Sequence, residues 1–151
     1  MLNSACAFSA EKFLFSLPAP PVMDARMKLA VIGSRDFADY DLMERCLLRN
    51  FRVEDIDAVI SGGARGADTL AARFAGRYGL LLEIIPADWK KHGRKAGPVR
   101  NAEIVERADV LVAFWDGLSR GTRDSITRAR LAGKRVMVFP CSSDAQESVD
   151  F

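Results

Sequence analysis

Short apolar segments alternate with amphipathic segments along most of the chain. The apolar segments have the length of buried strands and end at glycine, proline or polar residues. They cover residues 29–32, 57–60, 80–85, 110–114 and 135–139. Between them, apolar positions recur at three- and four-residue steps, which predicts helices. These helices are expected near residues 40–50, 67–78, 98–108 and 119–132.

This alternation predicts a fold class. Strands that are apolar on both faces and separated by helices form a parallel sheet covered on both sides, with right-handed crossovers. We therefore predict a Rossmann-like three-layer α/β/α sandwich with a mainly parallel five-stranded sheet. Ligands of such folds bind beyond the carboxyl ends of the strands, near the point where the strand order reverses. The loops that follow the first four strands should therefore converge on one crevice.

The predicted elements all fall within residues 28–140, which is enough chain for one domain with its own core. Residues 1–27 contain three prolines and no persistent helical period, so we interpret them as a mobile N-terminal arm. Met23 and Met27 leave open an internal start of the protein. Residues 141–151 are predicted to form a polar, weakly held tail.

The turn after the second strand has the build of a phosphate-binding loop. Gly62, Gly63 and Gly66 allow backbone N–H groups to approach an anion, and Arg65 adds a permanently charged donor. The alternative is that the glycines serve only the geometry of a tight strand-to-helix turn. Asp68 has two open interpretations, because it could contact a ribose hydroxyl or stabilise the dipole of the following helix.

Other strand ends carry polar residues of the same kind. Ser34 and Arg35 follow the first strand directly after Gly33, where a hydroxyl and a guanidinium can bind a phosphate. The alternative for Arg35 is a surface arginine that caps a helix. Arg100 and Asn101 lie near a predicted helix start, where arginine can reach a phosphate and asparagine can hydrogen-bond a base or ribose.

The fourth strand is followed by Asp116 and by a second predicted anion-binding helix start. The residues that form this start are Ser119, Arg120, Gly121 and Thr122. Two helix starts that face one crevice would suit a diphosphate.

Composition argues against a membrane-spanning protein and locates the positive charge in one segment. Apolar residues make up 49% and charged residues 28%, and no apolar run approaches the roughly 20 residues of a membrane span. The net charge of +2 is uninformative, but residues 88–100 contain five basic residues and one acidic residue. We expect a basic loop over residues 87–97, which either attracts phosphates or is simply solvated surface.

Cysteine and histidine are too sparse for a metal site. Three widely spaced cysteines and one histidine favour neither a zinc site nor a disulfide framework, so no metal is predicted and a cytoplasmic location is expected. His92, within the basic loop, is more readily a surface residue than a general acid or base. Trp89 and Trp115 could stack on a base, but we expect both to pack.

Four motifs, in order and with matching spacing, resemble the YspA-like branch of the SLOG superfamily. They are residues 30–37, residues 59–68, residues 86–89 with 97–103, and residues 113–117 with 119–122. This superfamily groups DNA-processing protein A and Smf proteins with the LOG phosphoribohydrolases. The resemblance implies a nucleotide or nucleotide-derived ligand in a Rossmann-like crevice. No cofactor is identified from the sequence. It also implies self-association, because relatives commonly form dimers.

The sequence departs from the LOG pattern at one position that matters for catalysis. The LOG motif Gly-Gly-x-Gly-Thr-x-x-Glu ends in a glutamate that takes part in breaking the N-glycosidic bond, whereas Ser125 stands at this step after Thr122. The remaining candidate catalytic carboxylates are Asp68, Glu103 and Asp116, and the sequence does not select among them.

Three functions therefore stay open. The first is a sensor or binding domain for a phosphate-bearing nucleotide derivative, such as an ADP-ribose-like molecule, which would need an effector protein. The second is a hydrolase that cleaves the N-glycosidic bond of such a ligand, because two carboxylates can in principle do this chemistry. The third is single-stranded DNA binding, with the basic loop along the phosphates.

Overall fold

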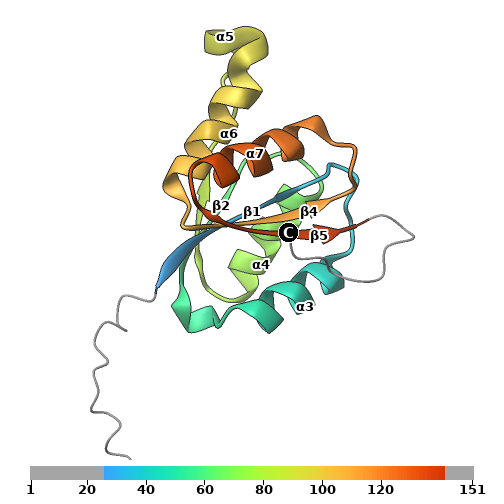
Figure 1. Ribbon diagram of the computed structural model, residues 1–151. Coiled ribbons are helices and arrows are strands. Elements are labelled where there is room, and N and C mark those ends of the chain that lie inside the picture. The colour runs from blue at the N-terminus through green and yellow to red at the C-terminus, as the bar shows by residue number, and fades with distance from the viewer. Residues whose placement is uncertain (1–25, 142–151) are drawn as a thin grey trace, which may run out of the picture.

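The structure, a computed structural model, describes residues 26–141 and contains one five-stranded sheet (Figure 1). The strand order is β3-β2-β1-β4-β5, and every neighbouring pair is parallel. The strands are β1 (Met27–Gly33), β2 (Ile56–Ser61), β3 (Leu81–Ile84), β4 (Val110–Trp115) and β5 (Arg135–Pro140). Most residues of the central strands β1, β2 and β4 are buried. This explains why they are apolar on both faces.

Helices cover both faces of the sheet, so the predicted Rossmann-like α/β fold is confirmed. The helices are α3 (Tyr40–Asn50), α4 (Ala67–Arg77), α5 (Trp89–His92), α6 (Ala96–Arg107) and α7 (Arg120–Leu131), with 3₁₀ turns η2 (Val53–Asp55) and η3 (Gly93–Lys95). Figure 1 shows α3 and α4 on one face and α6 and α7 on the other. Each face has its own apolar core, one centred on Phe74 and Phe114 and the other on Ile104 and Leu111.

The strand order reverses between β1 and β4. From β1 the chain moves outward through β2 to β3, and α6 then carries it back to β4 on the other side of β1. The loops after β1 and β4 therefore run to opposite faces of the sheet and leave a crevice at their carboxyl ends.

The predicted basic loop is the main error in the predicted secondary structure. Much of residues 87–97 is helical, because α5 and η3 lie there and α6 begins at Ala96. The Asp88 carboxylate caps α5 by accepting a hydrogen bond from Lys91 N at 3.0 Å. Pro98 is tolerated in the first turn of α6, where a backbone N–H has no partner within the helix.

The domain boundaries shift slightly. β1 begins at Met27, and the Cys141 backbone N–H donates to Trp115 O at 3.1 Å, so both residues belong to the folded part. The rest of the predicted arm and tail, residues 1–25 and 142–151, lies outside the described residues. Within residues 26–141, no helix has the length and apolar character needed to cross a membrane.

Candidate functional site

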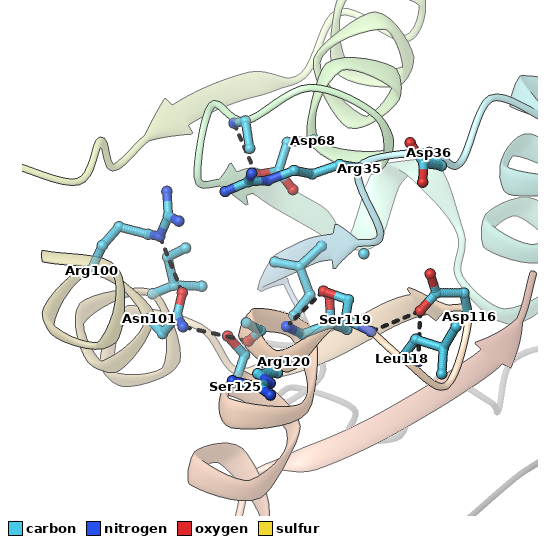
Figure 2. A pocket seen from close by; sticks show the side chains of 16 residues that line it. Arg35, Asp36, Asp68, Arg100, Asn101, Asp116, Leu118, Ser119, Arg120 and Ser125 are labelled. Carbon is cyan, nitrogen blue, oxygen red and sulfur yellow. Dashed lines mark hydrogen bonds between the residues drawn. The ribbon is translucent and has the colours of Figure 1, made fainter. Parts of the chain in front are cut away.

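A pocket of about 590 Å³ opens at the carboxyl ends of β1 and β4 (Figure 2), and we call it the switch-point pocket. Its volume is typical of small-molecule sites. It is lined by the end of β1 with the following loop, the start of α4, one side of α6 and the β4–α7 loop with α7. The lining residues are Ile32, Gly33, Arg35, Asp36, Ala64, Asp68, Arg100, Asn101, Ile104, Asp116, Leu118, Ser119, Arg120, Gly121, Thr122 and Ser125.

Two of the arginines in this pocket are not held by a direct ion pair with any described residue. Arg35 and Arg120 are exposed and make no hydrogen bond or ion pair with any residue between 26 and 141. They come from different walls, Arg35 from the loop after β1 and Arg120 from the first turn of α7. Two unpaired guanidinium groups at one pocket give it a positive potential that attracts phosphates.

The start of α7 is the better of the two anion-binding helix ends. Ser119 caps this helix, the first turn holds no acidic residue, and its first residues line the pocket. The start of α4 differs, because Asp68 lies in its first turn and Ala67 N already donates to Ser34 O at 3.2 Å. At α7 the first turn of the helix itself holds no acidic residue, and the carboxylate of Asp116 lies in the preceding loop, where it accepts hydrogen bonds from Leu118 N and Ser119 N.

Asp68 is the carboxylate that the pocket buries. Its side chain is only 7% exposed, and its Oδ2 accepts a hydrogen bond from Ala64 N at 3.1 Å. Burial raises the pKa of Asp68 to about 6, although the Ala64 N–H and the nearby Arg100 and Arg35 oppose the rise. A carboxyl with a pKa near neutrality can take up and release a proton at working pH.

Asp116 has a structural task in the loop before α7. Its Oδ1 accepts hydrogen bonds from Leu118 N at 2.8 Å and Ser119 N at 2.9 Å. Burial by itself would raise the pKa of Asp116, but these bonds and the Ser34 hydroxyl outweigh it and hold the pKa below its usual value. Asp116 therefore stays ionised and shapes the start of α7, which disfavours it as a proton donor.

Ser34 joins two loops and does not line the switch-point pocket. Its hydroxyl is buried and accepts a hydrogen bond from Asp116 N at 3.0 Å, while its carbonyl accepts from Phe37 N and Ala67 N at 3.2 Å. The sequence predicted a phosphate contact for Ser34, whereas the structure places it beneath the pocket as a support.

We expect Ser34→Ala to lower the free energy of unfolding by about 1–2 kcal/mol, because the Asp116 N–H would lose its acceptor in a buried place. Chemical denaturation measures this difference. Ser125→Ala is the matched control, since the Ser125 side chain is equally buried but its hydroxyl forms no hydrogen bond within residues 26–141. Equal effects of the two substitutions would contradict the assigned role of Ser34.

Arg100 and Asn101 start a hydrogen-bonded chain that ties α6 to its neighbours. Arg100 donates from Nη1 to Gly62 O at 2.8 Å and from Nε to Asn101 Oδ1 at 3.1 Å. Asn101 in turn donates to Asp124 Oδ2 at 3.0 Å, and Arg128 binds the same oxygen at 2.8 Å. A Cβ at Gly62 would lie 2.6 Å from Arg100 Nη1, so glycine is needed there for this approach.

The glycine turn lies mostly outside the switch-point pocket. Gly62, Gly63 and Arg65 line a second hollow of about 500 Å³, which we call the side hollow. Its other lining residues are Arg35, Ala64, Pro86, Ala87, Trp89 and Arg100. Gly66 lines neither hollow, because it packs against the backbone of the loop after β1.

The structure does not bring Glu103 to the other candidates. Its carboxylate pairs with Arg107 on the same helix at 2.8 Å and lines a separate depression on α6. Of the three candidate catalytic carboxylates, Asp68 alone is both buried and in the switch-point pocket. Among the described residues, no group of three or more histidine, cysteine, aspartate or glutamate side chains could hold a metal ion.

Several lining residues were not predicted. They are Ile32, Asp36, Ala64, Ile104, Leu118 and Ser125. Helical spacing could have indicated two of them, because Ile104 follows Asn101 by three residues and Ser125 follows Gly121 by four. The expectation that Trp89 packs was wrong, since its side chain is 58% exposed, whereas Trp115 packs as predicted and donates to Ser119 O at 3.0 Å.

Comparisons with known proteins agree with the fold and the motifs. The model of the family described as "YspA, cpYpsA-related SLOG family" matches residues 27–92. Gene 61 protein of Mycobacterium phage D29 is 45% identical over an alignment of 87 residues, and the match covers 54% of this chain and 70% of the phage protein.

Two solved structures share the fold. DNA processing protein A from Streptococcus pneumoniae superposes with a TM-score of 0.64 at 18% identity, over 81% of this chain and 53% of that one. This chain thus spans about half of the pneumococcal structure. DNA processing protein A from Helicobacter pylori, in a structure of its single-stranded DNA binding mode, gives 0.61 at 18% identity, over 87% of this chain and 73% of that one. The chain belongs to the YspA, cpYpsA-related SLOG family.

Proposed function

We propose that this protein binds a phosphate-bearing, nucleotide-type ligand in the switch-point pocket and acts as a ligand-binding or sensor domain. One observation carries the proposal. Arg35 and Arg120, neither of which forms a hydrogen bond or ion pair with the described residues, line the same pocket as the start of α7, whose first turn holds no acidic residue. A phosphate there would gain charge-assisted hydrogen bonds to guanidinium groups and to backbone N–H groups.

The remaining pocket groups suit the rest of a nucleotide. Ile32 and Ile104 give the floor an apolar part that could contact a base or the carbon face of a sugar. Asn101 is hydrogen-bonded to Asp124 and Arg100, so its side chain is held in one orientation at the wall. A site that is partly apolar, with a few fixed polar groups, is typical of small-ligand recognition.

We expect Arg120→Ala and Arg35→Ala each to weaken binding of a nucleoside phosphate by roughly 10- to 100-fold, because each removes a charge-assisted contact. Isothermal titration calorimetry with nucleoside mono- and diphosphates measures the change. Arg123→Ala is the matched control, since Arg123 is exposed on the same helix but lies outside the pocket. If nucleotides bind and neither pocket substitution weakens them, the ligand lies elsewhere.

A hydrolase is the second candidate, favoured by the buried Asp68 with its pKa raised to about 6. In this alternative the arginines hold the phosphate, and Asp68 either positions water or stabilises charge on the ribose. The same ligand panel tests it when free base is measured. Base release that disappears in Asp68→Asn would establish hydrolysis, and unchanged ligands after long incubation would leave the binding role.

Single-stranded DNA binding is the third candidate. The Helicobacter pylori relative in fold is described as binding single-stranded DNA, and Lys90, Lys91, Arg94 and Lys95 form no side-chain hydrogen bond or ion pair within residues 26–141. Oligonucleotides that bind with a steep salt dependence, while mononucleotides and dinucleotides do not bind, would replace our first proposal with this one.

A further inference from the structure

The side hollow and the switch-point pocket are neighbours that share part of their walls. Arg35, Ala64 and Arg100 line both of them. The two volumes, about 590 Å³ and about 500 Å³, are each within the range of a small-ligand site. A ligand that fills both hollows would therefore contact these shared residues.

The side hollow has features that the switch-point pocket lacks. Trp89 lies on its wall with 58% of the side chain exposed, although tryptophan is usually highly buried. Arg65 also lines this hollow, is exposed and makes no hydrogen bond or ion pair with the described residues. An exposed indole in a hollow that also holds an unpaired guanidinium is suited to stack on a nucleic acid base.

The position of the indole is fixed by local structure. Asp88 caps the short helix α5, accepting hydrogen bonds from Lys91 N at 3.0 Å with its carboxylate and from His92 N at 2.9 Å with its backbone carbonyl. The tip of the ring approaches Gly97 in the first turn of α6, where an added Cβ would lie 3.9 Å from it. The ring therefore leans on α6 while much of its surface stays open to solvent.

The positive charges of the shared arginines indicate which chemical group of a ligand would lie between the two hollows. Arg35 forms no hydrogen bond or ion pair with the described residues, and Arg100 donates hydrogen bonds to the carbonyl of Gly62 and the amide oxygen of Asn101. The charges of both arginines act on the Asp68 carboxyl, but neither forms a direct ion pair with it. Neither guanidinium charge is neutralised by a direct ion pair. A group that lies between them gains most if it is anionic, and a phosphate is the anion that joins nucleoside units.

We infer that the ligand consists of two nucleoside-type units joined through phosphate, with one unit in each hollow and the phosphate between Arg35 and Arg100. This inference rests on the proposed nucleotide-binding function and adds the class of ligand. The unit in the side hollow stacks its ring on Trp89. The other unit occupies the switch-point pocket beside the start of α7.

Calorimetry with matched ligands tests the inference on the full chain. The probes are the common nucleoside monophosphates, ADP-ribose, a 5′-phosphorylated dinucleotide and a decathymidylate. We expect at least one two-unit probe to bind tighter than any monophosphate, on the order of tenfold or more. The second hollow adds contacts to a ligand that has already lost its translational and rotational entropy. We expect no further gain for the decathymidylate.

Substitution of Trp89 separates the contribution of the side hollow to binding from that of the switch-point pocket. Trp89→Ala should weaken the two-unit probe roughly 5- to 100-fold and leave monophosphate affinity unchanged, while Trp89→Phe should retain most of the affinity. Lys90→Ala is the control, because Lys90 is exposed on the same short helix and lines neither hollow. Thermal melting of each variant checks that the fold is kept.

The outcomes distinguish this inference from the function on which it rests. If monophosphates bind and no two-unit probe binds tighter, or if Trp89→Ala weakens both kinds of probe equally, the inference is overturned and the proposed function stands. If no nucleotide binds at all, both fail. Affinity that rises only for the decathymidylate and falls steeply with salt would indicate a DNA strand in place of a two-unit ligand.

Discussion

Gly66→Ala is expected to lower the free energy of unfolding by about 3–5 kcal/mol, the largest effect of a single substitution that the structure suggests. Gly66 has φ of 79° and ψ of −126°, a conformation that residues with a side chain rarely adopt. A Cβ there would also overlap the backbone carbonyl oxygens of Ser34 and Arg35. The backbone strain and the steric overlap both arise from the added Cβ, because the turn before α4 packs directly against the loop after β1.

Gly76→Ala is the matched control for this prediction. Gly76 lies within helix α4, which follows Gly66, and an added Cβ at Gly76 would meet nothing within 4 Å. Alanine should therefore stabilise the protein there by about 0.5–1 kcal/mol, through the lower backbone entropy of the unfolded chain. Denaturation by urea, followed by circular dichroism, measures both. Equal small effects would contradict the close packing of the two loops.

The second large effect is expected from Asp68→Asn, which should raise the free energy of unfolding at pH 8 by about 2–3 kcal/mol. Burial raises the pKa of Asp68 from 3.8 to about 6, so the folded protein holds this proton more tightly than the unfolded chain. As the pH rises from about 4 to above 6, the unfolded state loses the proton first, and the folded state loses stability relative to it. Asparagine removes this ionisation and can still accept the Ala64 N–H.

The pH dependence of the free energy of unfolding shows whether the ionisation of Asp68 causes this effect. Unfolding curves of the wild type and Asp68→Asn should converge as the pH falls below about 4 and diverge between pH 4 and 7. Asp116→Asn should behave in the opposite way, because the pKa of Asp116 is lowered and its stabilising contribution is present at neutral pH and lost on acidification. Parallel curves for the wild type and Asp68→Asn at all pH values would contradict a raised pKa.

Much of the fold could be predicted from the sequence, because buried parallel strands must be apolar on both faces. The helix expected over residues 40–50 is α3 with the same bounds, and the strand expected over residues 110–114 is β4 with one further residue. Burial of both faces leaves a continuous apolar run that is visible without the structure.

The helical content of residues 87–97 could not be predicted in the same way. No apolar period persists in this basic segment, and helix α5 is only four residues long. Its structure depends on the cap at Asp88 and on contact between Trp89 and the start of α6. The exposure of Trp89 follows from that tertiary arrangement.

The candidate site, too, could be predicted only in part from the sequence. The sequence predicted that loops at the strand ends meet, since parallel strands end at one edge of the sheet. It did not separate Asn101 from Glu103, although each helical residue turns by about 100° and two residues therefore point to opposite sides of α6. Nor did it show that Asp116 accepts hydrogen bonds from Leu118 N and Ser119 N, or that Asp68 is buried.

The sequence by itself determined the succession of strands and helices along the chain. It also determined the family and the loops from which a site would be built. Hydrophobic periodicity and motif spacing are local along the chain and can be read there. Only the tertiary structure decided that the glycine turn between β2 and α4 faces the side hollow, that Arg35 and Arg100 stand between two hollows, and that Asp68 is buried. Direction and burial of a side chain depend on residues far away in the chain, such as the contact of Gly66 with Ser34 and Arg35.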